Sequence, residues 1–319
     1  MNFPNVTVLI VTYNYGQYIG DAIESVCNQT YPQDKVEIVI VDDGSSDNTQ
    51  ALVKKYLEKK SNIKYYYQNN EGKASATKKG IELSTGDYLF NLDADDFYHP
   101  NCIEDTIQIY NNYPDVVQVS HVPNRWEVKN NVSIPQLHKH HYVNRSMIGI
   151  DLYRKSMFNG VTFCMGSCFS CRMSIIKSSI IMEDIDMYID YFLFFYTLTR
   201  GRVYILNKVL STFRRHEKAY SEGHIKYEST EIRTLRYLKS ARAVYREVKV
   251  LFKDETDIVK RTYVDLLEHE ISGIKYTRAS RIILWIKYMK SILNIFYKYS
   301  NPTLYLIRGV KKSFYCFTK

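Results

Sequence analysis

The first half of the chain opens with short, apolar, β-branched runs that alternate with segments of helical apolar spacing. Such nearly all-apolar runs are typical of strands buried on both faces of a parallel sheet. The predicted strands are Val6–Val11, Val36–Val41, Ile63–Tyr67 and Tyr88–Leu92, and the predicted helices are Ile19–Asn28, Thr49–Lys60 and Ala74–Leu83. Strands that alternate with helices over short connections indicate a doubly wound α/β sheet.

Polar residues follow three of these strands at the point where each strand ends. They are Thr12, Tyr13 and Asn14 after the first strand, Asp42 and Asp43 after the second, and Asp93 and Asp95 after the fourth. In a doubly wound sheet, ligands bind outside the carboxyl ends of the strands, near the point where the strand order reverses. One ligand could therefore contact all three sets.

The segment Asp93–Asp96 carries three carboxylates. Acids crowded at a strand end repel one another, and a bound cation removes that repulsion. Hard divalent cations such as Mg²⁺ or Mn²⁺ prefer oxygen ligands and can share them with diphosphate oxygens. The alternative is a solvated acidic loop that caps a helix starting near Pro100.

The chemistry of these acids suggests different roles for them. An aspartate at a strand end can accept the imide N–H of uracil, although Asp42 or Asp43 could instead cap the helix that follows Asp47. Asp93 and Asp95 point the same way along an extended segment, so one can accept hydrogen bonds from a ribose while the other reaches the metal. Asp96 is left as an adjacent, spare carboxylate, or as a group that supports the metal ligands from behind.

Taken together and in this order, the motifs resemble those of the family 2 glycosyltransferases, which have the GT-A fold. The matching segments are Thr12-Tyr13-Asn14, Val41–Asp47, Asn70-Glu71-Gly72 through Gly80, and Asp93-Ala94-Asp95-Asp96. The resemblance covers residues 5–100 strongly and residues 160–220 more loosely. It implies a mixed sheet flanked by helices, a nucleotide-sugar donor, an Mn²⁺ or Mg²⁺ ion on the Asp-x-Asp element, and inversion at the anomeric carbon. Among the matching positions, Asn70, Gly72 and Ala94 are further candidates for contact with the donor.

One position departs from the family pattern. Family members carry Ala-Arg-Asn ahead of the glycine that matches Gly80, whereas this chain has Thr77 at the arginine position. Lys78 or Lys73 is expected to supply the cation that faces the diphosphate. A lysine is a point charge and lacks the fork geometry of arginine.

The segment Ile189–Tyr196 is nearly all apolar and aromatic apart from Asp190. A buried carboxylate is costly unless it has a partner or a function, and burial raises its pKa, which suits a general base. The resemblance points the same way, because the family places its base as an acid followed by an aromatic residue, about eleven residues before a glycine that Gly201 matches. Asp184 and Asp186 compete for this role, and Asp190 could instead cap its own helix.

Phe213-Arg214-Arg215-His216 looks like the aromatic-Arg-x-His element that ends the catalytic domain of many family members. On this resemblance, His216 is a further candidate metal ligand, and Arg214 is a candidate to neutralise the departing diphosphate. The strands predicted ahead of this element are Val116–His121, Phe163–Phe169 and Val203–Leu206. The chain lacks a Gln-x-x-Arg-Trp motif, which argues against a processive polysaccharide synthase.

Cys164, Cys168 and Cys171 have the spacing of iron–sulfur ligands in radical enzymes that use S-adenosylmethionine. They lie deep in the chain, around an apolar run, and lack the first-strand context of such enzymes. Buried free cysteines are therefore the favoured interpretation. The scattered cysteines, the absence of a signal peptide ahead of the first strand and the absence of a membrane-spanning apolar run predict a cytoplasmic protein.

The cluster of His138, His140 and His141 could bind zinc, but no nearby acid or cysteine completes a ligand set. We favour a loop that faces the acceptor. The region that contains this cluster, residues 122–160, has mixed character and includes Pro123 and Pro135.

Positive charge is concentrated near the C-terminus. The net charge is +9, and residues 277–319 contain nine Lys or Arg and no acid. The rest of the chain is close to neutral, which argues against nucleic acid as a partner. Segment Arg281–Tyr299 places Lys287, Lys290 and Lys298 on one stripe of an otherwise apolar helix, which suits peripheral contact with an anionic membrane at the inner face of the plasma membrane. The alternative is a helix that packs on the catalytic domain or in a homo-oligomer.

We therefore predict a catalytic domain over residues 1–220 and a helical region over residues 221–319. The predicted function is transfer of a hexose from a nucleotide-diphospho-sugar, with a UDP-sugar favoured. The acceptor would be a hydroxyl of a glycan or lipid-linked glycan in the synthesis of cell-surface polysaccharide or glycoconjugate. Two other classes stay open: a sugar-nucleotide nucleotidyltransferase, and a non-catalytic carbohydrate-binding scaffold, for which the missing arginine leaves room.

Overall fold

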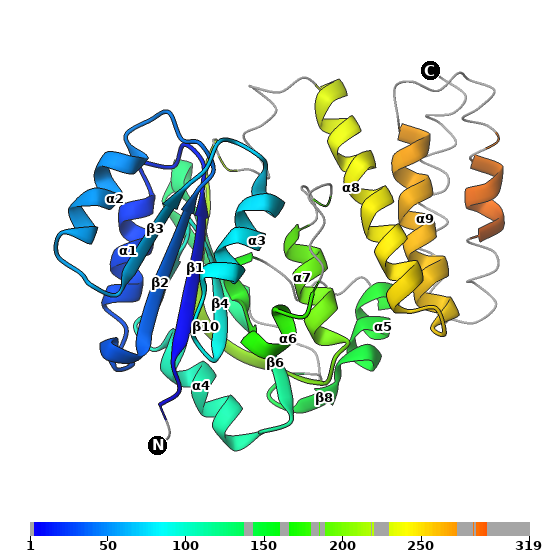
Figure 1. The fold of residues 1–319 in the computed structure, drawn as a ribbon. Helices are drawn as coiled ribbons and strands as arrows, with labels where there is room; N and C mark the ends of the chain where they lie inside the picture. The colour runs from blue at the N-terminus through cyan, green and yellow to red at the C-terminus, as the bar shows by residue number, and fades with distance from the viewer. Residues whose placement is uncertain are drawn as a thin grey trace. The chain divides into compact units, whose positions relative to one another are not determined.

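The computed structural model divides the chain into two compact units (Figure 1). Unit 1 comprises Met1–Tyr153, Phe163–Glu183 and Ile189–His224, and unit 2 comprises Arg154–Thr162, Asp184–Tyr188 and Ile225–Lys319. The structure describes residues 3–136, 143–159, 166–179, 185, 189–217, 219, 230–272, 283 and 285–291. The division falls inside helix α5 (Gly149–Asn159).

Unit 1 is built on a mixed sheet, in which the described residues form ten strands in the order β3-β2-β1-β4-β9-β6-β10-β5, with β7 beside β6 and β8 beside β10. The strands are β1 (Val6–Thr12), β2 (Val36–Asp42), β3 (Ile63–Tyr67), β4 (Tyr88–Asp93), β5 (Phe97–Tyr98), β6 (Val116–Glu127), β7 (Val132–Pro135), β8 (Ser146–Ile148), β9 (Phe169–Arg172) and β10 (Arg202–Arg215). β1 to β4 are mutually parallel, and β9 runs antiparallel between β4 and β6.

Helices cover both faces of this sheet. They are α1 (Ile19–Cys27), α2 (Thr49–Leu57), α3 (Lys73–Leu83), α4 (Cys102–Asn112), α6 (Met173–Ile176) and α7 (Ile189–Leu198), with 3-10 turns η1 (Gln33–Lys35), η2 (Val128–Asn130) and η3 (Gly166–Cys168). α1 and α2 lie on one face, and α3 lies on the other (Figure 1). Val8 and Ile10 of β1 belong to the core cluster under α1, whereas a Cβ at Gly80 of α3 would lie 2.2 Å from Leu9, so α3 packs very closely on the opposite face.

The parallel strands of unit 1 end at nearly the same level. Thr12 of β1 lies opposite Asp42 of β2, and Val11 lies opposite Asp93 of β4. Side chains that leave the carboxyl ends of these strands therefore share one edge of the sheet. The loops that follow β1, β2 and β4 lead into α1, α2 and β5, respectively. These three loops therefore begin at the carboxyl-end edge of the sheet.

Unit 2 contains helices α8 (Thr230–Leu251) and α9 (Thr256–Ser272), which pack side by side as a hairpin (Figure 1). Leu238, Ala241 and Leu266 form the buried contact between them. Arg242 and Glu270 add an ion pair at 3.1 Å. Within the part of the chain that the structure describes, no helix is both long and apolar enough to cross a bilayer.

Candidate active site

The loop after β1 is held to the loop after β2 by Asn14. The Asn14 backbone has a φ of 58°, in the left-handed region that asparagine tolerates. Its side-chain Oδ1 accepts a hydrogen bond from the N–H of Ser46 at 2.8 Å, and its own N–H donates to the hydroxyl of Ser45 at 2.8 Å. The neighbouring Tyr13 is exposed, and the buried hydroxyl of Thr12 has no partner among the described residues. Tyr13 is thus accessible to a ligand at the sheet edge, whereas the Thr12 hydroxyl is enclosed.

Asp42 is fully buried and holds the turn that follows β2. Its Oδ1 accepts the N–H of Ser45 at 2.8 Å, and its Oδ2 accepts the hydroxyl of Tyr65 at 2.8 Å. At the start of α2 a different acid acts: Asp47, which precedes the N-cap residue Asn48, accepts the N–H of Thr49 at 2.9 Å. The helix-capping role considered for Asp42 or Asp43 therefore belongs to Asp47.

Asp43 organises the segment that leads into α3. Its carboxylate accepts the backbone N–H groups of Glu71 at 2.9 Å and Gly72 at 3.0 Å, and the side-chain amide of Gln68 at 2.8 Å. Gly72 has a φ of 95°, which a side chain would rarely allow, and Asn70 in the same turn is exposed. Asp43 thus determines where α3 begins, and with it the position of the lysine at the first turn of that helix.

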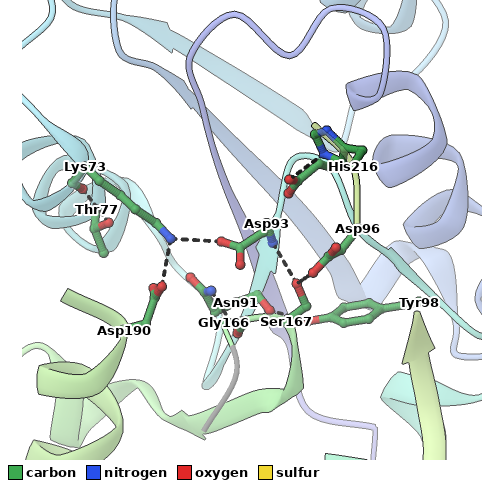
Figure 2. A network of polar contacts seen from close by, with 11 residues as sticks. Lys73, Thr77, Asn91, Asp93, Asp96, Tyr98, Gly166, Ser167, Asp190 and His216 are labelled. Atoms are coloured by element: carbon green, nitrogen blue, oxygen red, sulfur yellow. Dashed lines mark hydrogen bonds and ion pairs between the residues drawn. The ribbon is translucent and has the colours of Figure 1, made fainter. Parts of the chain in front are cut away.

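Lys73, the first residue of α3, joins two of the predicted functional acids (Figure 2). Its Nζ lies 3.0 Å from Oδ1 of Asp93 and 2.8 Å from Oδ2 of Asp190. Burial raises the pKa of Asp190, against the opposing charge of Lys73. Burial also lowers the pKa of Lys73, but the charges of Asp190 and Asp93 outweigh this and hold that pKa well above its usual value. The ammonium is therefore charged and lies between the two carboxylates.

The structure brings Lys73, and not Lys78, to the acids. Lys78 is exposed, and five further residues at 100° each turn it about 140° away from Lys73 around the helix axis. Thr77, at the position where the family resemblance expects arginine, is buried and shares the face of Lys73. Its hydroxyl donates to the carbonyl oxygen of Lys73 at 2.7 Å, so it supports the first turn of α3.

Asp96 is a buried, bonded carboxylate and not a spare one. Ser167 donates its hydroxyl to Oδ2 of Asp96 and accepts the N–H of Asp93 at 3.1 Å (Figure 2). The N–H of Arg214 donates to the other oxygen of Asp96 at 2.9 Å. Burial, with the charges of Asp95 and Asp93, raises the pKa of Asp96 well above its usual value. Asp96 and Ser167 thus connect the Asp-x-Asp segment to β10 and η3.

Asp95 and His216 form a nearly buried pair beside this network. His216 Nε2 lies 3.0 Å from Asp95 Oδ2, with side-chain exposures of 4% and 11% respectively. The ring of Tyr18 packs on the imidazole at a centroid distance of 4.3 Å. Ala94 is buried and turns its side chain into the core cluster. Ala94 and Asp95 form a turn, in which the N–H of Asp96 donates to the carbonyl oxygen of Asp93 at 3.0 Å, and not the extended segment that was expected. Asp93 and Asp95 are therefore directed to two different partners, Lys73 and His216.

Arg214 is enclosed, in contrast to its expected position facing the departing diphosphate. Its side chain is 5% exposed, and its Nη2 pairs with Asp21 of α1 at 2.7 Å. The guanidinium also lies over the rings of Tyr18, Phe97 and Trp126, at 4.9, 5.5 and 5.3 Å from the centroids. Cation–π contacts of this kind and the carboxylate partner balance its charge, while its buried Nε has no hydrogen-bond partner among the described residues. The arrangement indicates that Arg214 supports the walls of the site.

A divalent cation is compatible with the side chains at the sheet edge. Among the described residues, no group of three or more His, Cys, Asp or Glu side chains forms a complete metal site. However, an oxygen of Asp95 and a nitrogen of His216 converge, and Asp93 lies two residues away. Mg²⁺ in particular is commonly held by one or two protein carboxylates while substrate phosphates complete its coordination. The donor set therefore fits a cation shared with a phosphate ligand.

Several residues of this site give weak signals in the sequence. Tyr18 and Asp21 reach Arg214 from the start of α1, and Trp126 reaches it from β6. Ser167 reaches Asp93 from η3. An exposed acid on an amphipathic helix or a serine ahead of a strand has no local feature that marks it.

Some candidates lie outside the described residues. They are Cys164, the histidines at 138, 140 and 141, and Asp184 and Asp186. The other two cysteines of the spaced cluster, Cys168 and Cys171, are free and buried, and burial raises the pKa of both thiols. Both are core residues, as expected.

The mixed sheet with helices on both faces and polar loops at its parallel strand ends is the GT-A fold. S. aureus TarS 1-349 in complex with UDP superposes with a TM-score of 0.58 at 17% identity, over 91% of this chain and 89% of that one. The mannosyltransferase PcManGT from Pyrobaculum calidifontis, solved with GDP-Man and Mn²⁺, gives a TM-score of 0.55 at 16% identity, over 99% and 86% of the two chains.

Residues 7–179 match the sequence profile described as Glycosyl transferase family 2, which is just over half of the chain. The chain therefore belongs to glycosyl transferase family 2. It is 41% identical over 108 residues to an uncharacterized glycosyltransferase of Rickettsia typhi (34% of this chain, 32% of that protein). It is 38% identical over 117 residues to an uncharacterized glycosyltransferase of Nostoc sp. (36% of this chain, 35% of that protein). The chain thus spans about a third of the length of the curated relatives it matches.

Proposed function

We propose that this protein is an inverting, metal-dependent hexosyltransferase. The observation that carries the proposal is the meeting of Asp190 and Asp93 at the ammonium of Lys73. It brings a carboxylate of α7, with a raised pKa, next to the acids at the strand ends. A carboxylate of this kind is suited to deprotonate an alcohol close to a phosphate-binding edge. Membership of glycosyl transferase family 2 supports the reaction class.

The proposed donor is a nucleotide-diphospho-sugar, with a UDP-sugar favoured. Structures of TarS 1-349 in complex with UDP and with UDP-GlcNAc share this fold, which supports the choice for this chain. The exposed Tyr13 and the buried Thr12 hydroxyl lie beside loops held by Asn14, Asp42 and Asp43. These loops would receive the nucleotide with little rearrangement, because their backbone groups are already fixed by side-chain hydrogen bonds.

Asp95 and His216 would hold the Mn²⁺ or Mg²⁺ ion, and Asp93 would either complete the protein ligands or accept a ribose hydroxyl. When bound, such a cation neutralises negative charge that develops as the nucleoside diphosphate leaves. The chain contributes the fixed orientation of these ligands. Tyr18 packs against the imidazole, and the network through Asp96 holds the segment that carries Asp95.

Asp190 would take the proton of the acceptor hydroxyl as that oxygen forms its bond to the anomeric carbon. The bond between that carbon and the diphosphate oxygen breaks on the opposite face, and its electron pair leaves with the nucleoside diphosphate. The configuration at the sugar is thereby inverted. The Asp190 side chain is 33% exposed, so an acceptor hydroxyl can reach it.

A panel of UDP-, GDP- and dTDP-sugars with Mn²⁺ tests the proposal. One donor is expected to raise the stability of the protein, by about 2.7 kcal/mol at a hundredfold excess over its dissociation constant, and to release nucleoside diphosphate. Release of pyrophosphate would instead identify a nucleotidyltransferase. Stabilisation by a sugar with no released product would identify a carbohydrate-binding scaffold.

We further propose peripheral contact with an anionic membrane, where a lipid-linked glycan would be the acceptor. Residues 283 and 285–291 are helical, and Ile283, Ile286, Lys287 and Lys290 are exposed at one-turn spacing. Isoleucine and lysine on one helix face suit the headgroup region of such a membrane. A homo-oligomer contact remains the competing role for this face.

The membrane contact predicts that the full-length protein sediments with liposomes containing phosphatidylserine at low salt and stays in solution with neutral liposomes. Exchanging Lys287 and Lys290 for glutamate should weaken this binding by about 1 kcal/mol or more for each residue. The matched control is the same exchange at Lys249 and Lys253, two exposed lysines of unit 2 that lie outside residues 283–291. Equal sedimentation with both kinds of liposome would contradict the proposal, and a dimer that dissociates in the glutamate variant would favour the oligomer.

A further inference from the structure

Lys73 is connected to elements that lie far apart in the chain. It begins α3, while its two acidic partners come from β4 and from α7 (Figure 2). The distances of 3.0 Å to Asp93 and 2.8 Å to Asp190 are those of charge-assisted hydrogen bonds. The ammonium therefore connects the carboxylate of the proposed base directly to the carboxyl end of the central strand β4.

The surroundings of Lys73 favour this bridging position over contact with a diphosphate. Two carboxylates at one edge would repel each other, and one ammonium between them removes much of that repulsion. The side chains of Lys73, Asp93 and Asp190 are only 21%, 27% and 33% exposed, so solvent weakens their interaction less than at an open surface. These two carboxylates already take two of the three N–H donors of the ammonium.

The residue one turn further along α3 is consistent with this assignment. Thr77 lies on the same helix face as Lys73, but its short side chain is buried and bonded to the backbone of that turn. A long cation at residue 77 would approach the site from a different height along the helix axis. In this chain the cation comes from the first turn, where the turn held by Asp43 fixes its starting point.

We propose that Lys73 is a positioning residue that acts through Asp190, holding the base at a fixed place relative to the donor edge. This inference rests on the proposed function, because it assigns Lys73 to the same reaction. A cation in such a site could position the base or bind the donor diphosphate, and we assign only the first role to Lys73. Lys73 serves the acceptor step through the base, and binding of the donor diphosphate depends on other groups.

Replacing Lys73 with methionine is the first test. A carboxylate displaced by about 1 Å loses about 100-fold in rate, so kcat for sugar transfer is expected to fall about 10- to 100-fold while the donor KM stays within about threefold. K73R, which keeps a cation able to bond to carboxylates, should recover part of kcat. The matched control is K79M in the same helix, turned about 120° from Lys73, where the ammonium lies 3.9 Å from Glu82. K79M is expected to match the wild type.

A double variant separates positioning from an independent contribution. If Lys73 acts through Asp190, then K73M combined with D190N should be no slower than D190N alone, because the effects of groups that act as a unit do not add. Additive losses in the double variant would overturn the inference, and so would a raised donor KM with unchanged kcat in K73M. Thermal unfolding checks that each variant is folded.

Two outcomes keep the inference separate from the proposed function. Should K73M fail to fold, K73R decides the matter: a lower kcat at unchanged donor KM supports positioning, and a changed donor KM at unchanged kcat overturns it. A wild-type protein that transfers no sugar from any donor in the panel would overturn the proposed function, and this inference with it. An active wild type with an unaffected K73M variant would overturn the inference alone.

Discussion

Replacing Asp190 with asparagine is expected to lower the rate of sugar transfer by about 10²- to 10⁴-fold, because general-base assistance contributes that much. The amide has nearly the same shape as the carboxylate and can still contact Lys73, but it cannot accept the acceptor's proton. Donor binding should change little, since the proposed donor groups are at the strand ends. The measurement is kcat for transfer together with the donor dissociation constant, each compared with the wild type.

The matched control for Asp190 is Asp254→Asn, an exposed acid in the turn between α8 and α9, which should retain full activity. The pH profile of the wild type gives a second readout. An ordinary aspartate has a pKa of about 3.9. Because burial raises the pKa of Asp190, this carboxylate becomes protonated at a higher pH than an ordinary aspartate does. Activity should therefore fall on acidification earlier than in a site with an unperturbed base. Near-full activity of the asparagine variant would show that another group is the base.

Replacing Asp95 with asparagine is expected to weaken the Mn²⁺-dependent binding of a nucleoside diphosphate by about 100-fold or more. Loss of a residue that only orients a metal ligand costs 10- to 100-fold in metal affinity, and a direct ligand should cost at least as much. Titration calorimetry of the diphosphate, with and without Mn²⁺, measures the effect without relying on turnover. Binding without Mn²⁺ should be similar in the variant and the wild type.

Asp34→Asn is the control for Asp95, because Asp34 is exposed in η1, away from the carboxyl ends of the strands. EDTA should abolish sugar transfer by the wild type, and added Mn²⁺ or Mg²⁺ should restore it. If the Asp95 variant kept its metal-dependent affinity, the metal ligands would have to be sought among other residues. If EDTA had no effect on an active wild type, the metal role itself would be wrong.

The strands and helices of the first 95 residues could be predicted closely, since each is marked by its own pattern of apolar residues. β1 and β2 extend one residue beyond the predicted runs, and α3 begins at Lys73, one residue before the predicted start. β6 and β10 differ more, because they extend to Glu127 and Arg215, past their apolar runs. Their polar ends pair with each other across shifts in register, and such pairing has no signature in either segment alone.

The site divides in the same way. The acids at 93 and 95 follow a buried strand, so their place at the sheet edge could be inferred from the chain. Their separate partners could not, because Lys73 and His216 reach them from remote segments. The choice between Lys73 and Lys78 depended on the rotation of α3, which the turn held by Asp43 sets. The predicted strand ended at Leu206, so neither the position of Arg214 on β10 nor its pairing with Asp21 of α1 could be inferred.

Local patterns in the chain were therefore sufficient to specify the alternating strands and helices, the polar strand ends and the family to which they belong. Periodicity and strand termini are properties of a few neighbouring residues, and burial of their apolar faces enforces them. Which carboxylate contacts which cation depends on the packing of β4, α3, α7 and β10 against one another. Long side chains that meet across such elements are governed by distances of a few ångströms in space, and spacing along the chain carries no record of those distances.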